Sequence, residues 1–127
     1  MIKYILILAL PLLAESCSAA HDASFYSLHP NALQQAIDRC PGTHPAGVDC
    51  EQLNQVAMRA NNLASELHED PQAFGKKILA LQEDLAKLNK ALQNKPNQPE
   101  LQASINSNNM QLGERLAIVK WLESPRG

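Results

Sequence analysis

A run of apolar residues spaced alternately four and three positions apart dominates the second half of the chain. The spacing is kept between residues 74 and 92, which is more than two heptads. Such a period places every member on one side of an α-helix and does not fit the two-residue period of a strand. We therefore predict a long helix here. Its apolar side, called the leucine seam below, consists of Phe74, Ile78, Leu81, Leu85, Leu88 and Leu92.

Other segments show the same helical period. A helix is predicted from Pro30 to Cys40, because proline suits the first helical position. A second is predicted over residues 50–68, where Asp49 and Gln52 have the spacing of a capping box. Asp70 is the predicted N-cap of the seam helix. After the prolines of residues 94–99, a last helix is expected to bury Leu101, Ile105, Leu112, Leu116, Val119 and Leu122, with Trp121 one step off this stripe.

These helices define the fold class. Only 4% of the residues are aromatic, so the core must consist mainly of aliphatic side chains, which suits helices better than a β-sandwich. Residues 21–28 lack a helical stripe and are predicted to be a short tether. The chain is therefore predicted to be all-α, a small bundle of about four helices. We expect a first helical hairpin over residues 21–70 and a leucine-rich antiparallel helical hairpin over 71–127, packed together as one domain.

The N-terminus has the pattern of a secretory signal peptide. Lys3 supplies the positive charge, and residues 5–14 supply an apolar stretch of about ten residues, too short to span a bilayer. Two cleavage sites compete. Ser18 and Ala20 form a small-x-small site, which would end the signal peptide at residue 20 and release a soluble protein. Residues 14–17 instead resemble a bacterial lipobox, which would end it at residue 16 and put a lipid anchor on Cys17. Either way the chain is exported.

Either cleavage leaves one pair of unmodified cysteines, because Cys17 is either lipidated or removed. Cys40 and Cys50 form an even pair in an exported protein, and an oxidising compartment favours a disulfide between them. The bond would join the end of the 30–40 helix to the start of the 50–68 helix, giving a disulfide-stapled αα-hairpin. The alternative is a zinc site formed by Cys40, His44 and Cys50, with His29 nearby, but the spacing matches neither a zinc finger nor a zinc ribbon. We therefore predict no metal ligands.

Catalytic and nucleic-acid-binding patterns are missing from the sequence. There is no G-x-S-x-G, no phosphate-binding glycine loop and no H-E-x-x-H. His68, Glu69 and Asp70 could suggest acid–base chemistry, but polar residues at a helix junction ordinarily cap and solvate helix ends. The net charge is −2 and no basic stripe is present, which argues against nucleic acid as a partner. We predict that the protein is not an enzyme and needs no cofactor.

If the protein acts by binding, the sequence offers two candidate surfaces for contact with a partner. Phe25 and Tyr26 precede the first predicted helix, and they either pack onto the hairpin or contact a partner. The leucine seam is expected to lie inside the monomer. The alternative is that it joins a second copy in a homodimer or meets the coiled coil of a partner.

The stretch that reads FYSLHPNALQQAIDRCPGTHPAGVDCEQLNQVAMRA carries a recognisable combination of residues. An aromatic pair, Phe25 and Tyr26, is followed by His29 and Pro30 opening a helix. A first cysteine, a short loop, a second cysteine and a helix with Ala57, Ala60 and Ala64 come next. With the leader, this pattern resembles the entry-exclusion lipoprotein family (EexN-like) of conjugative and type IV secretion systems, over roughly residues 1–64.

The resemblance implies a function and a location. It implies a bacterial envelope protein, periplasmic or outer-membrane-anchored, that touches the membrane only through the lipid on Cys17. Such proteins are thought to block redundant DNA transfer by contacting a protein of the transfer machine, and they offer no catalytic residues. It makes Phe25, Tyr26, His29 and Pro30 the candidate partner-binding residues. The sequence departs from the family pattern in two features. They are the unusual lipobox residues Ala14 and Glu15 and the long C-terminal hairpin.

Overall fold

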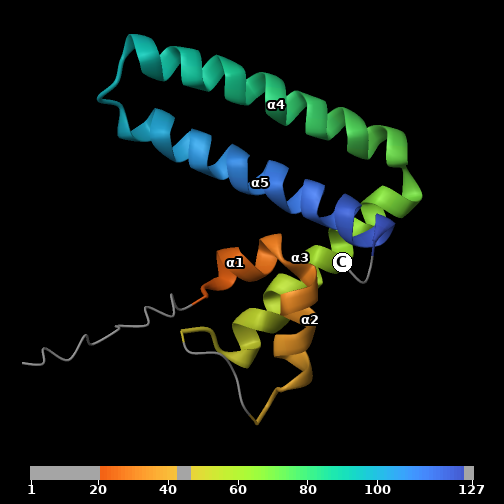
Figure 1. Ribbon diagram of the computed structural model, residues 1–127. Coiled ribbons are helices and arrows are strands. Elements are labelled where there is room, and N and C mark those ends of the chain that lie inside the picture. The colour runs from red at the N-terminus through yellow and green to blue at the C-terminus, as the bar shows by residue number, and fades with distance from the viewer. Residues whose placement is uncertain (1–20, 43–46, 125–127) are drawn as a thin grey trace, which may run out of the picture.

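The computed structural model describes residues 21–42 and 47–124, which form five helices and no strand. The helices are α1 (Ala23–Leu28), α2 (Pro30–Asp38), α3 (Cys50–Glu69), α4 (Pro71–Asn94) and α5 (Pro99–Glu123). Figure 1 shows α1, α2 and α3 gathered at one end, while α4 and α5 form a long hairpin that extends away from them. The all-α class and the helical bundle are confirmed.

The ends of the longer helices follow the predicted caps. At the start of α3, the Gln52 N–H donates to the Asp49 carboxylate at 2.8 Å, and the Asp49 N–H donates to the Gln52 side chain at 3.0 Å. At the start of α4, the Asp70 carboxylate accepts from the Ala73 N–H at 2.9 Å. Each such cap contributes about 1 kcal/mol, so short polar signals fix where two long helices begin.

The expected tether over residues 21–28 is wrong, because most of it forms α1. The Asp22 side chain accepts a hydrogen bond from the Phe25 N–H at 3.0 Å and caps this helix. Tyr26 is 4% exposed and packs with α2 and α3. A helix of six residues is too short to show an apolar period, and it gains its stability from tertiary packing, which the sequence pattern does not reveal.

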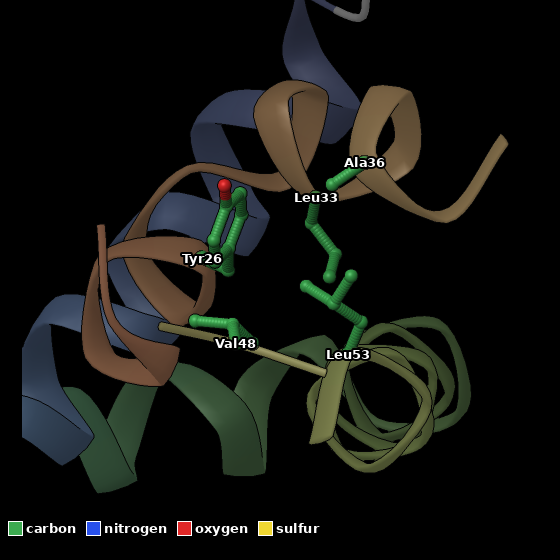
Figure 2. Packing of buried hydrophobic residues seen from close by; sticks show 5 residues of the cluster. All are labelled: Tyr26, Leu33, Ala36, Val48 and Leu53. Atoms are coloured by element: carbon green, nitrogen blue, oxygen red, sulfur yellow. The ribbon is translucent and has the colours of Figure 1, made fainter. Parts of the chain in front are cut away.

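A disulfide joins Cys40 and Cys50, as predicted, with their Cα atoms 6.0 Å apart. It closes the turn between α2 and α3, where the Cys40–Pro41 peptide bond is cis. Beside this turn lies the first hydrophobic core, and Figure 2 shows the side chains of its buried residues converging from α1, α2, α3 and the segment before α3. These residues are Tyr26, Leu33, Ala36, Val48 and Leu53. Burying Leu53 completely contributes about 2 kcal/mol.

The leucine seam lies inside the chain, between α4 and α5. Leu81 and Leu85 of the seam are buried, as is Ile105 on α5, and the two helices run antiparallel side by side (Figure 1). Near the N-terminal end of α4, the seam residue Phe74 belongs to a second core with Leu63 of α3 and Ile118 of α5. The hairpin is therefore attached to the α1–α3 part through packed apolar side chains.

The predicted apolar stripe of α5 is wrong in its second half. Leu116 and Leu122 are each 45% exposed, whereas Ile118 is 1% and Glu114 only 5% exposed. The reason is that α5 changes neighbours along its length. It packs along α4, and its second half, from Gly113 to Trp121, also contacts α1, α2 and α3, which bury a different side of the helix. A single stripe cannot describe a helix with two buried faces.

Two ion pairs join α3 to the second half of α5. The Arg59 Nε donates to the buried Glu114 carboxylate at 2.6 Å, and Arg115 donates to Glu66 at 3.0 Å. The Arg115 guanidinium also lies 4.8 Å from the centre of the Phe74 ring, a cation–π distance. These contacts fix how α5 crosses α3, and with it the position of the C-terminal end of α5 beside α2.

Candidate partner-binding surface

The four predicted contact residues have different surroundings in the fold. Tyr26 is part of the core and presents little surface, whereas His29 is exposed and Pro30 is partly exposed. Phe25 is also partly exposed and packs at the edge of the core. The exposed members therefore belong to the elbow between α1 and α2, and the buried one holds that elbow against α3.

Phe25 is enclosed between two histidine rings. Its ring stacks on His21 with a centroid distance of 3.7 Å and on His29 with a distance of 4.1 Å. The His29 Nδ1 lies 2.8 Å from the Phe25 carbonyl oxygen, so this ring nitrogen must be the donor. The arrangement orients His29 and rigidifies the residue that precedes α2.

Pro30 lies between two surface hollows that meet at Trp121. The first hollow, of about 270 Å³, lies between the α1–α2 elbow and the end of α5, and Lys120 is on its edge. The second, of about 360 Å³, lies between α2 and α3. Both are lined by Pro30 and by Trp121, which is the one tryptophan in the chain.

Trp121 is held in place by a residue far away in the sequence. Its indole N–H donates to the Asn31 side-chain oxygen at 2.9 Å, which joins the end of α5 to the start of α2. A partly exposed aromatic ring fixed by a hydrogen bond is the kind of side chain that anchors protein–protein contacts. The sequence placed Trp121 off the apolar stripe, but it carried no signal that this ring would lie beside Pro30.

In the described part of the chain, neither the zinc site nor the acid–base site considered from the sequence is assembled. The sulfurs of Cys40 and Cys50 are bonded to each other and are not free thiolates for zinc, and His44 lies outside the described residues. No group of three metal-binding side chains occurs among the described residues. Near the α3–α4 junction, Asp70 caps α4, and its neighbours His68 and Glu69 are exposed.

The export signals lie outside the described residues, including Cys17 and the alternative cleavage site after Ala20. Within residues 21–42 and 47–124, no helix combines the length and apolarity that crossing a bilayer requires. Comparison of the chain with protein-family models, with curated proteins and with solved structures gave no match.

Proposed function

We propose that this protein is an exported envelope lipoprotein, anchored through Cys17, that acts by contacting another protein. Its role would be entry exclusion, or an accessory role, in a conjugation or type IV secretion system. The observation that carries the proposal is the Cys40–Cys50 disulfide at the turn between α2 and α3. Disulfides persist in oxidising compartments such as the periplasm, and this one lies within the segment that resembles the entry-exclusion lipoproteins.

The shape of the molecule supports a role in which it obstructs a partner. Only four residue steps separate Cys17 from His21, so a lipid on Cys17 would hold His21, where the described part of the chain begins, within about 14 Å of the membrane surface. Helix α4 has 24 residues and is about 36 Å long, so the α4–α5 hairpin greatly enlarges the space that the anchored protein occupies. The anchored protein would recognise its partner through the hollows beside Trp121. Its α4–α5 hairpin would be the bulky arm that prevents productive docking.

A mating experiment tests the proposal. Recipient cells expressing the wild-type protein should receive a matching conjugative element less often than cells without it. The Cys17→Ser variant should lose both palmitate label and exclusion, because the protein would no longer be held at the membrane. A recipient that expresses Ser16→Ala, which keeps the acceptor cysteine, is the matched control. Unchanged uptake with and without the wild-type protein would eliminate entry exclusion.

The alternative is a soluble secreted or periplasmic helical protein, such as an effector or adaptor, cleaved after Ala20. The small residues Ser18 and Ala20 before His21 favour this reading. The palmitate experiment separates the two forms, because a protein cut after Ala20 carries no label with or without the Cys17→Ser change. Sedimentation of the purified protein would show in addition whether two copies join through the leucine seam.

A further inference from the structure

Helix α2 supplies much of the surface around Trp121. Pro30 lines both hollows, Asn31 lines the first, and Ile37 lines the second. The side-chain oxygen of Asn31 also accepts the hydrogen bond from the Trp121 indole, at 2.9 Å. The shape of the candidate binding surface therefore depends on where α2 lies.

Helix α2 is only weakly specified by its own sequence. It has nine residues, and isolated helices shorter than about 12 residues are marginal in water. Unlike α3 and α4, it has no side-chain hydrogen bond that caps its N-terminus. Two of its residues, Leu33 and Ala36, are buried, and both face the first core (Figure 2). Its position is therefore decided by contacts with other segments.

Two of these contacts act at opposite ends of α2. Asn31, in the first turn, bonds to Trp121, and the disulfide holds Cys40, two residues after the last helical residue. Both cysteines of the bond are partly exposed, and exposed disulfides are the ones that thiols open most readily. The caps of α3 and α4 and the second core contain no residue of α2. Loss of the bond therefore acts first on α2.

We propose that the Cys40–Cys50 disulfide is a redox switch for the surface around Trp121. The oxidised protein holds α2 against Trp121, and the reduced protein releases α2 while α3, α4 and α5 stay folded. This inference rests on the proposed function for the role of the surface, whereas the coupling of the bond to the surface is a property of the fold. An exported protein would gain its binding surface when the bond forms in an oxidising compartment.

The reductant is a dithiol, such as the reduced active site of a thiol oxidoreductase. One of its thiolates attacks a sulfur of the pair, the Cys40–Cys50 bond breaks, and a mixed disulfide forms. Its second thiol then displaces that sulfur, so the dithiol leaves as a disulfide. Its two protons and two electrons end on Cys40 and Cys50 as two thiols. In the chain-entropy estimate, opening the loop between them raises the equilibrium constant for release of α2 by about a hundredfold.

Fluorescence of the single tryptophan, Trp121, tests the proposal in purified protein that carries Cys17→Ser. Dithiothreitol reduces the pair, and far-UV circular dichroism shows whether the helices persist. We expect the reduced protein to keep most of its helical signal, since α2 is only nine residues long. The Trp121 emission should shift to longer wavelength, and its quenching by acrylamide should rise at least about twofold.

Reversal and a cysteine-free variant provide the controls. Removal of dithiothreitol and reoxidation should restore the emission and the quenching of the oxidised protein. A variant with Cys40→Ser and Cys50→Ser should have the properties of the reduced protein and should not respond to dithiothreitol.

Two residues of α2 provide matched variants. Asn31 bonds to Trp121, whereas Gln35 is exposed one helical turn later and lines neither hollow. In the oxidised protein, Asn31→Ala should raise the quenching of Trp121, and Gln35→Ala should leave it unchanged. In the reduced protein neither change should have a further effect, because α2 no longer reaches Trp121. A bond with a purely stabilising role would not abolish the effect of Asn31→Ala.

Several results would overturn the inference. They are a Trp121 signal that is the same in oxidised and reduced protein, an Asn31→Ala effect that persists after reduction, and a pair that dithiothreitol leaves bonded. Loss of the whole helical signal on reduction would also overturn it, because the bond would then hold the entire fold together. Fluorescence and mating report separately. A redox-dependent Trp121 without exclusion refutes only the proposed function, and exclusion with a redox-independent Trp121 refutes only the switch.

Discussion

Removing the disulfide should cost this protein a large part of its stability. The perturbation is the double change Cys40→Ala and Cys50→Ala, made together with Cys17→Ser so that no acyl chain complicates the measurement. In the folded protein the two sulfurs are bonded, and the bond links the segment just after α2, which holds Cys40, to Cys50, the first residue of α3. The changes therefore remove a covalent link while leaving the caps and the core residues in place.

The size of the effect follows from the loop that the bond closes. Cys40 and Cys50 are 10 positions apart, so the closed loop has 11 residues. In the chain-entropy estimate, opening this loop raises the entropy of the unfolded chain and so lowers the free energy of unfolding by about 2.8 kcal/mol at room temperature. Domains are stable by only about 5–15 kcal/mol in total, and small domains tend to lie near the lower end. The bond should thus contribute a substantial fraction of the free energy of unfolding.

Urea unfolding followed by far-UV circular dichroism measures this quantity. We expect the double variant to lose about 3 kcal/mol relative to the oxidised protein, and the reduced wild-type protein to lose a similar amount. Agreement between the two would attribute the loss to the bond and not to the alanines. A loss below about 1 kcal/mol in both would refute the reasoning, since it would mean that the α2–α3 turn is equally restricted without the bond.

Two further predictions concern the packing of α5. Arg59→Ala should destabilise the protein by about 1–3 kcal/mol in urea unfolding, because the buried Glu114 loses its partner, and adding Glu114→Leu should restore most of the loss. An unchanged midpoint in the single variant would show that the pair is unimportant. Gly75→Ala should raise stability by about 1 kcal/mol, because a helical alanine there meets no neighbour. Gly113→Ala should gain less, since its Cβ would lie 2.8 Å from the Leu28 side chain, and equal gains would contradict the close packing of α1 on α5.

Local signals predicted most of the helices, because they act over a few residues. The Asp49–Gln52 capping box and the Asp70 cap begin α3 and α4 at the predicted positions. The seam spacing was long enough to specify one face of α4, and the cysteine pair specified the turn that precedes α3. Each of these features is complete within a short segment of sequence.

The features that the sequence did not predict depend on contacts between segments that are far apart in the chain. Helix α1 is too short for a period and depends on the burial of Tyr26 against α2 and α3. The pairing of Arg59 with Glu114 spans 55 positions, and that of Trp121 with Asn31 spans 90. No spacing rule connects residues so far apart. The Trp121 hollows, which are the main candidate binding surface, therefore became visible only when α5 was placed beside α2.

The accurate mass of the mature protein from its native envelope tests the central claim, which is export, anchoring at Cys17 and oxidation of the remaining cysteines. We expect the mass of residues 17–127 with added acyl groups, reduced by two hydrogens for the Cys40–Cys50 bond. The unmodified mass of residues 21–127 would support the soluble alternative. A mass that retains the whole leader, with the thiols of Cys40 and Cys50 free, would contradict export and the proposed function with it.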